Sequence, residues 1–161
     1  MIRASDRRLV RSIYMMRCGY CQVSEADIGA ELTCDHFQPQ SLGGSDEPDN
    51  LVYACHACNE FKGDYFSDSV ETQLLHPLRD DLTLHVRQQE DGKLQGVTAA
   101  GQRYIDRLQL NRRPLVLYRK IQLRAERSIA RYELIHTRLE QIIVRIERVE
   151  EQINSLRNKG H

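Results

Sequence analysis

The spacing of hydrophobic positions changes along the chain, and each spacing predicts a different element. Helically spaced apolar residues after Ser5 predict a capped helix of about three turns. Short apolar runs at 31–37 and 51–53 predict two strands, separated by a segment rich in proline and glycine that predicts a loop. A helix is expected to begin near Cys55.

A second group of short elements follows. Apolar residues at 82–86 alternate with polar ones, and Asp91-Gly92 supplies a turn before a further apolar pair at 94–97. This pattern predicts a β-hairpin. Thr98 is expected to cap a helix that ends near Asn111.

From Pro114 a single long helix is predicted, because neither glycine nor proline follows until Gly160. Its length is roughly 67 Å for about 45 residues at 1.5 Å each. Apolar positions step alternately by three and four, which is typical of a coiled-coil seam. The seam consists of Tyr132, Ile135, Leu139, Ile142, Ile146, Val149, Ile153 and Leu156. We expect residues 118–156 to associate with further copies of the chain or with a helical protein partner; the alternative is a helix packed on its own domain.

The charges beside this seam bear on its partners. We letter the heptad a to g with the seam at a and d. Arginines then fall at g and glutamates at b: Arg124, Arg131, Arg138, Arg145, Glu126, Glu133, Glu140 and Glu147. An antiparallel two-helix pairing would set g against g and is the least expected form. Parallel pairing of g with e is tolerated, and Ile129 and Ile143 at e widen the apolar face, which favours more than two helices.

Composition narrows the class of protein. The 161 residues are 40% hydrophobic and 29% charged, which fits a soluble globular protein and not a disordered one. No run of 18 apolar residues exists, so no membrane span is expected. The N-terminal segment is rich in arginine and lacks the apolar core of a secretory signal. We therefore expect a cytoplasmic protein.

The net charge of the whole chain is zero, but its segments carry net charges of opposite sign. Five arginines and one aspartate give residues 1–17 a charge of +4, whereas one lysine and nine acids give residues 18–64 a charge of −8. Residues 112–161 carry +6, from twelve bases and six acids. Basic ends around an acidic middle suggest a polyanion at the ends and a metal cation in the middle. Ordinary solvated charge on separate elements is the alternative.

Five cysteines in a reducing compartment favour metal ligation over disulfides. Four of them form two C-x2-C pairs, which can close a tetrahedral site around one structural Zn²⁺. Iron at the same ligands, or two chance pairs, are the alternatives. Cys34 is expected to be a packed free thiol, and His56 is expected to point away from the metal. The predicted ligands are Cys18, Cys21, Cys55 and Cys58.

The motifs around these cysteines occur in an order that is specific. They are Asp35-His36-Phe37, Pro39, Ser41-Leu42-Gly43-Gly44, Asn50-Leu51 and the run from Cys55 to Gly63. Residues 1–66 thereby resemble the HNH endonucleases, in particular the zinc-ribbon subtype with two C-x2-C pairs. Residues 76–120 resemble the downstream part of small, stand-alone bacterial HNH proteins. Residues 121–161 carry no such resemblance.

The resemblance implies a ββα-metal fold around one catalytic divalent metal. It implies His36 as the general base, Asp35 and Asn59 as metal ligands, and Asn50 as the residue that braces the loop and orients the His36 ring. Because the third signature residue is Asn59 and not histidine, Mg²⁺ or Mn²⁺ is favoured. The chemistry agrees, since a neutral histidine suits proton removal from water and oxygen ligands suit a hard cation. Adjacent strand residues point to opposite faces, so Asp35 and His36 can serve one phosphate only if the strand ends or is distorted there.

The expected fold is therefore α+β: a nuclease module with its zinc site at 1–66, a β-hairpin and helix extension at 67–111, and a long associating helix at 112–161. The expected function is metal-dependent hydrolysis of phosphodiester bonds in DNA. The alternatives are a non-catalytic, zinc-binding nucleic-acid module and an assembly subunit that acts through its C-terminal helix. The expected contacts to nucleic acid are Arg7, Arg8, Arg11, Arg17 and Lys62.

Overall fold

The computed structural model describes residues 2–159 of the chain. They form two compact units, one that extends to Arg119 and one that begins at Lys120. The first unit contains all the strands and the short helices, and the second is a single helix. The two units are described separately below.

The first helix, α1 (Ala4–Ile13), begins one residue before the predicted cap. Arg3 is the N-cap residue and provides no side-chain cap, so the expected cap at Ser5 is wrong. Asp6 lies in the first turn and pairs with Arg3 at 2.6 Å. The acidic side chain therefore stabilises the helix start by an ion pair and by its position near the positive end of the helix dipole.

The predicted strands form an antiparallel hairpin of β1 (Thr33–His36) and β2 (Leu51–Ala54). All four residues of β2 are buried. β1 ends at His36, opposite Leu51. The helix α3 (His56–Lys62) follows β2 directly, with Cys55 as its N-cap residue.

Between α1 and β1 lies a short helix, α2 (Glu25–Ile28), in a segment that showed no regular pattern. A capping box holds it, because Ser24 and Asp27 exchange hydrogen bonds between side chain and backbone. Glu25 accepts two hydrogen bonds from Arg11 at 2.5 and 2.7 Å, and this ion pair joins α2 to α1.

The second hairpin differs from its prediction at the start. Leu82–Leu84 form a 3-10 turn and not a strand, because the Asp81 side chain accepts a hydrogen bond from the Thr83 backbone and closes a turn there. The paired strands are β3 (Val86–Gln88) and β4 (Leu94–Gly96).

The helix α4 (Ala99–Arg107) is capped by Thr98, as predicted, through a 3.1 Å hydrogen bond from the Gly101 backbone. Asn111 does not end this helix. Its amide group instead exchanges two hydrogen bonds with the backbone of Leu94, at 2.7 and 2.8 Å, and so extends the edge of β4 with a side chain.

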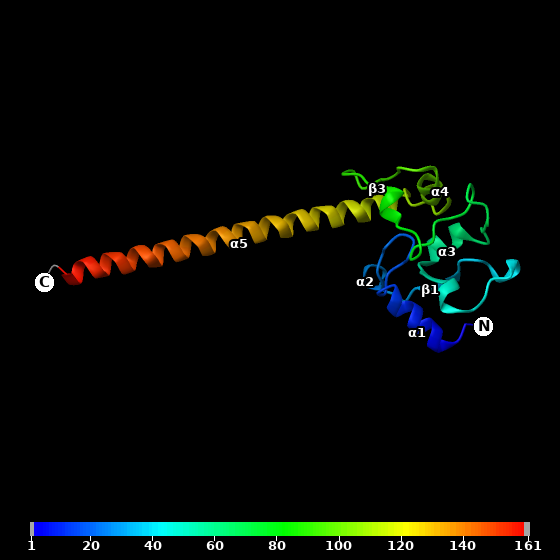
Figure 1. Ribbon diagram of the computed structural model, residues 1–161, viewed down its shortest axis with the longest axis horizontal. Coiled ribbons are helices and arrows are strands. Elements are labelled where there is room, and N and C mark those ends of the chain that lie inside the picture. The colour runs from blue at the N-terminus through cyan, green and yellow to red at the C-terminus, as the bar shows by residue number, and fades with distance from the viewer. Residues whose placement is uncertain (1, 160–161) are drawn as a thin grey trace. The chain divides into compact units, whose positions relative to one another are not determined.

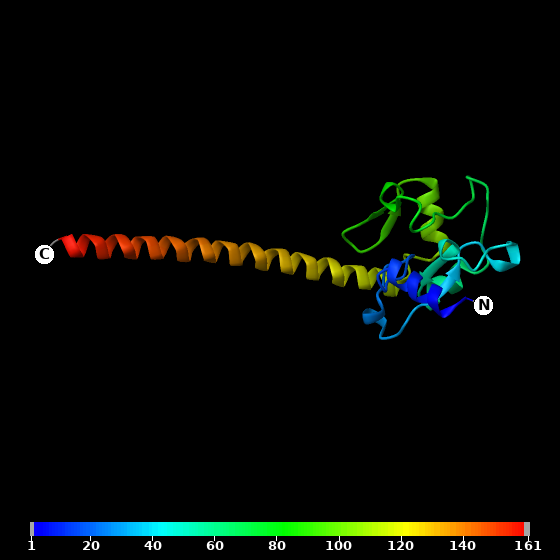
Figure 2. The same cartoon turned by 60° about the horizontal axis from the view of Figure 1, so that its bottom comes forward.

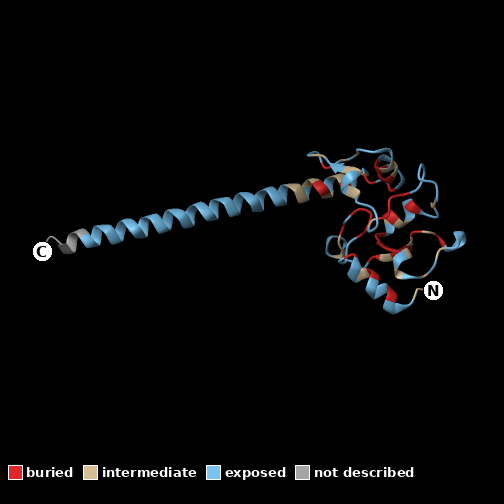
Figure 3. Ribbon diagram, viewed as in Figure 1, coloured by how far each residue is buried: buried red, intermediate tan, exposed pale blue. Residues whose placement is uncertain are grey.

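In Figure 1 α3 lies between β1 and α4, and Figure 2 shows the same ribbon turned by 60°. The core of this unit includes residues of α1, β1, β2, α4 and the start of the last helix, together with the segments that connect them. Figure 3 shows the buried residues of the ribbon in red. Tyr53, Tyr104, Ile105 and Leu108 are among its largest fully buried members.

The last helix, α5 (Arg113–Lys159), confirms the long helix that the sequence predicted. Its first turns belong to the first unit, where Leu115 and Arg119 are buried. Arg119 donates hydrogen bonds to the carbonyl groups of Gly92 and Leu110 at 2.6 and 2.7 Å. From residue 124 to residue 155 every side chain is exposed (Figure 3). None of the helices in the described residues is apolar over a length that could cross a membrane.

Candidate zinc cluster and catalytic pocket

The four cysteines of the two C-x2-C pairs come together as predicted. All four are buried, and their sulfur atoms lie within 4.8 Å of one another. The Sγ atoms of Cys21 and Cys55 are 3.7 Å apart. A tetrahedral zinc ion with Zn–S bonds of about 2.3 Å requires sulfur separations of roughly 3.8 Å. The cluster therefore has the donors and the spacing that a structural Zn²⁺ needs.

Backbone hydrogen bonds hold the first cysteine pair in a tight turn. The Cys18 amide donates to Val23 at 2.9 Å, and the Gln22 amide donates back to Cys18 at 2.8 Å. Gln22 has a φ of 66°, a strained value for a residue other than glycine, and this bends the chain back after Cys21. Gly19 also donates to Tyr53 at 2.7 Å, which fixes the turn against β2.

Arg112, for which the sequence predicted no contact with the cysteines, lies beside the cluster. Its Nη2 atom is 3.4 Å from the sulfur of Cys58 and 4.0 Å from that of Cys55. The guanidinium group also lies over the Phe61 ring, 5.3 Å from its centroid. A fixed positive charge here stabilises the thiolate forms that a metal requires. His56 is exposed and is not part of the sulfur group.

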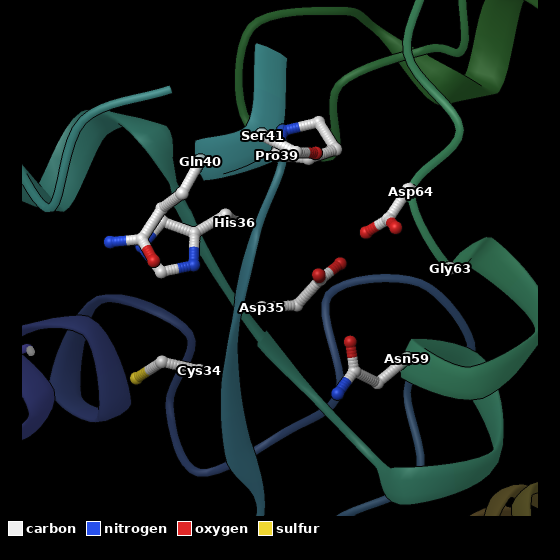
Figure 4. A pocket seen from close by; sticks show the side chains of 9 residues that line it. All are labelled: Cys34, Asp35, His36, Pro39, Gln40, Ser41, Asn59, Gly63 and Asp64. Atoms are coloured by element: carbon white, nitrogen blue, oxygen red, sulfur yellow. The ribbon is translucent and has the colours of Figure 1, made fainter. Parts of the chain in front are cut away.

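A pocket of about 470 Å³ lies at the end of β1, between the β1–β2 loop and α3. In Figure 4 the side chains of Asp35, Asn59 and Asp64 point toward one another. The ring of His36 lies on the other side of β1, next to Gln40. The full lining is Cys34, Asp35, His36, Pro39, Gln40, Ser41, Asn59, Gly63 and Asp64.

The His36 ring has a carboxylate partner that the sequence did not indicate. Its Nε2 atom lies 2.7 Å from Oδ1 of Asp46, in the loop between the strands. Gln40 donates to the same oxygen at 2.8 Å. The hydrogen bond to His36 is the main reason that the pKa of Asp46 is below its ordinary value. Asp46 therefore remains ionised beside the imidazole at neutral pH.

Asn50 closes the loop that carries Asp46. Its side chain accepts from the Gln38 backbone at 2.9 Å, and its amide group donates to Gln38 and Ser45 at 3.0 and 2.9 Å. These bonds brace the loop as the family resemblance implied. The resemblance also gave Asn50 the task of orienting the His36 ring, but the side-chain partner of that ring is Asp46.

Asp35 is buried and nevertheless held by polar groups on both oxygens. Tyr20 donates to Oδ2 at 2.7 Å, and the ammonium group of Lys62 lies 3.3 Å from Oδ1. Burial raises the pKa of Asp35, and the positive charge of Lys62 and the Tyr20 hydroxyl oppose this rise. An ionised carboxylate has about four acceptor positions, so these two bonds leave room for a cation.

Lys62 has a different place from the one expected of it. Its side chain is only 1% exposed, and its ammonium group donates to the His36 carbonyl at 2.5 Å as well as to Asp35. A third contact, to the Gly63 carbonyl, is 3.3 Å long. Because protein oxygens surround this charge, we withdraw the expected phosphate contact. Burial lowers the pKa of Lys62, and Asp35 opposes the shift.

The carboxylate of Asp64 is the third oxygen group at the pocket and was also missed by the sequence analysis. It follows Gly63, which ends α3 with a φ of 52°, a value at which glycine avoids strain. Arg107 from α4 donates to the Lys62 carbonyl at 2.7 Å and so fixes the end of α3. This turn brings Asp64 back toward Asn59 and Asp35 (Figure 4).

The predicted nucleic-acid contacts in the N-terminal segment differ in their availability. Arg7 and Arg8 on α1 are exposed. Arg11 is held by its ion pair with Glu25. Arg17 is exposed and donates to the Gln22 carbonyl at 3.1 Å. Of these four cations, Arg7, Arg8 and Arg17 are exposed.

The pocket thus has two chemically distinct halves. Two carboxylates and one amide provide the hard oxygen donors that Mg²⁺ or Mn²⁺ prefers, and they fit such a cation. A histidine with a carboxylate partner provides a group that can accept a proton.

Comparison with known proteins agrees with this geometry. Residues 18–64, which contain both cysteine pairs and the lining of the pocket, match the model of the HNH endonuclease family. Searches of curated proteins and of solved structures found no match to the chain.

Proposed function

Because the chain carries an HNH endonuclease domain at residues 18–64, we propose that it is a divalent-metal-dependent endonuclease that hydrolyses phosphodiester bonds in DNA. The observation that supports this proposal best is that Asp35, Asn59 and Asp64 point toward one another in a pocket that His36, the partner of Asp46, also lines. These residues provide the two requirements of the reaction, a proton acceptor and a site for a cation.

In this proposal His36 is the general base. Its Nε2–H donates to Asp46, so the neutral ring keeps its proton on that nitrogen and Nδ1 is left as the acceptor. Nδ1 takes the proton of the attacking water, and Asp46 stabilises the imidazolium that forms. Asn50 acts on His36 only indirectly. Its hydrogen bonds to the Gln38 backbone close the base of the loop that carries Asp46.

Asp35, Asn59 and Asp64 would hold the catalytic Mg²⁺ or Mn²⁺. When bound, this cation would stabilise negative charge on the phosphate and on the departing oxygen. The positive charge of Lys62 favours the ionised form of the buried Asp35 carboxylate and holds this side chain in place. The four cysteines would hold a structural Zn²⁺, which joins the turn after α1 to the start of α3 and so fixes the helix that carries Asn59.

Double-stranded DNA is the proposed substrate. Residues 18–64 carry a net charge of −8, so most of the attraction to phosphate must come from other segments. The exposed Arg7 and Arg8 on α1 and Arg17 beyond it are the proposed backbone contacts. They would position the duplex and carry no sequence information themselves.

The test is cleavage of supercoiled plasmid by the purified full chain with Mg²⁺ or Mn²⁺, with linear duplex, single-stranded DNA and RNA in parallel. His36→Ala should lower the rate by roughly two to four orders of magnitude and leave the zinc content unchanged. Gln141→Ala, on the exposed part of α5, is the control and should cleave like the wild type.

A His36→Ala variant that keeps more than about a tenth of the activity would remove His36 from the role of base. A wild-type chain that binds DNA but cleaves no substrate with either metal would favour the second candidate, a non-catalytic zinc-binding module. The four-cysteine cluster, which needs no catalytic metal, is the observation that keeps this alternative open.

A further inference from the structure

An apolar stripe runs along the exposed part of α5. It comprises heptad positions a, d and e, and its side chains are each about half exposed, which leaves one face of the helix in contact with water. Its apolar members between residues 129 and 153 are Ile129, Tyr132, Ile135, Leu139, Ile142, Ile143, Ile146, Val149 and Ile153. Soluble proteins rarely leave so long a contiguous apolar face uncovered.

The charges on the two sides of this stripe have opposite signs. With 3.6 residues per turn, position g lies about 120° to one side of position a, and position b lies about 100° to the other side. The g row is basic and the b row is acidic over four successive heptads, each row repeating every seven residues. The two rows are Arg124, Arg131, Arg138 and Arg145, and Glu126, Glu133, Glu140 and Glu147.

These charges have no arginine–acid or lysine–acid partners at helical spacing within their own helix, although the His136 ring lies 3.4 Å from the carboxylate of Glu140. None of the four arginines has an acidic residue three or four positions away. None of the four glutamates has an arginine or lysine at those distances. Helices that are stabilised on their own commonly use such pairs. The two rows therefore contribute no arginine–glutamate pairs to an isolated helix, and their segregation is explained if each row faces another chain.

We propose that α5 associates in parallel with further copies of itself, so that the arginine row of one helix faces the glutamate row of its neighbour. Two parallel helices that pack face to face are related by a rotation about an axis that runs along the helices. When positions a, d and e all lie in the interface, this rotation places position g of one helix next to position b of the other. An antiparallel pair is related by a perpendicular rotation, which sets arginine against arginine and glutamate against glutamate. The electrostatic pattern thus selects one orientation.

The same pattern argues for a second copy over an unrelated helical protein. A helix with one basic and one acidic edge is complementary to itself in the parallel orientation, and no other sequence is needed to neutralise it. A stripe of three heptad positions is wider than a two-helix seam, so we expect more than two helices around it.

The experiment compares three variants of the full chain by sedimentation equilibrium. Arg131→Glu with Arg138→Glu reverses part of the g row. Addition of Glu133→Arg and Glu140→Arg to these restores opposite charges across a parallel interface and returns the net charge to that of the wild type. The matched control, Arg127→Glu with Arg148→Glu, makes the same change of net charge at position c, on the far side of the helix from the stripe.

We expect the wild type to be oligomeric at about 10 µM, a concentration in the range of ordinary micromolar affinities. The g-row variant should dissociate at a concentration about tenfold or more higher, because several ion pairs worth a fraction of a kcal/mol each become repulsive. The four-residue variant should recover to within about threefold, and the c-position control should resemble the wild type. Circular dichroism and zinc content show whether each variant is folded.

A monomeric wild type, or one that associates only with a different protein, would overturn the proposal. Equal association of the wild type and the g-row variant would also overturn the proposal. In an antiparallel pair position g faces position g, so the substitutions exchange arginine–arginine repulsion for glutamate–glutamate repulsion and leave the association unchanged. These outcomes concern α5 alone, so the plasmid assay on the His36 variant distinguishes failure here from failure of the proposed nuclease activity.

Discussion

The ammonium group of Lys62 lies 2.5 Å from the carbonyl oxygen of His36, at the last residue of β1. The same group contacts the carboxylate of Asp35, so one buried cation joins α3 to two consecutive residues of the strand. A lysine in this position neutralises the Asp35 carboxylate and also fixes the backbone from which the His36 ring projects. Its contribution is therefore both to stability and to the geometry of the pocket.

Lys62→Met should destabilise the protein by about 3 kcal/mol, because it leaves the Asp35 carboxylate buried without its cation. Urea denaturation monitored by circular dichroism measures this change. Lys93→Met, at an exposed lysine, should change the free energy of unfolding by no more than about 0.5 kcal/mol. Adding Asp35→Asn to Lys62→Met should recover part of the loss. Wild-type stability of the single variant would show that the pair contributes nothing.

Asp46→Asn should lower kcat for DNA cleavage about tenfold to a hundredfold and leave KM nearly unchanged. The reason is that the amide no longer stabilises the imidazolium of His36 in the transition state. Asp49→Asn, in the same loop but without a contact to the ring, is the control. An increase in KM without a change in kcat would place Asp46 in substrate binding instead.

Cys58→Ser should abolish stoichiometric zinc and unfold the N-terminal unit, since metal binding by this cluster contributes to folding. Cys34→Ser, at a buried cysteine outside the cluster, should keep one zinc per chain. Zinc content by mass spectrometry and helix content by circular dichroism are the two measurements. A folded Cys58→Ser protein with a full equivalent of zinc would contradict the four-cysteine site.

The ion pair of Glu25 and Arg11 should make stability depend on acid pH. The Arg11 guanidinium lowers the pKa of Glu25 from 4.5 to about 2 in the folded state. Because the pKa of Glu25 is lower in the folded state than in the unfolded state, the ion pair stabilises the fold fully at pH values above the unfolded pKa. This stabilisation is lost as the pH falls from about 5 to 2. Glu25→Gln should therefore be less stable than the wild type at pH 7, and the difference should shrink below pH 3. Glu31→Gln, at an exposed position, should show no such change.

The sequence predicted those parts of the site that depend on local spacing. Two C-x2-C pairs specify a sulfur cluster because each pair places two ligands on one short turn. The two strands of the first hairpin followed from their residue patterns, with bounds that differ by one or two residues, and the start of α3 was expected near Cys55. The long helix followed from the absence of proline and glycine after Pro114.

The remaining features depend on contacts between segments that are distant in the sequence. Lys62 looked like a surface cation because its partners, Asp35 and the His36 carbonyl, come from a strand 26 residues earlier. Asp46 lies in a loop whose path is set by Asn50, and no spacing rule relates an acidic loop residue to a histidine ten positions before it. Leu82 and Leu84 alternate like a strand, but Asp81 closes a local turn that the alternation does not reveal.

Hydrogen bonds between Asn50 and Gln38 close the base of the loop between β1 and β2. They separate the loop residues beyond them from the residues of the pocket that lie on β1 and α3. Asn50 joins its side chain to Gln38 by two hydrogen bonds and so continues the ladder of β1 and β2 by one step without using a strand residue. The part of the loop beyond these hydrogen bonds, which includes Asp46, can change in length or sequence without moving Asp35 on β1 or Asn59 on α3. Doubling the length of a flexible loop raises the free energy of loop closure by only about 0.6 kcal/mol. Insertions in this loop should therefore reduce the stability of the protein only slightly. Loop exchange would thus alter the surroundings of His36, the proposed base, while leaving Asp35 and Asn59, the proposed cation ligands, where they are.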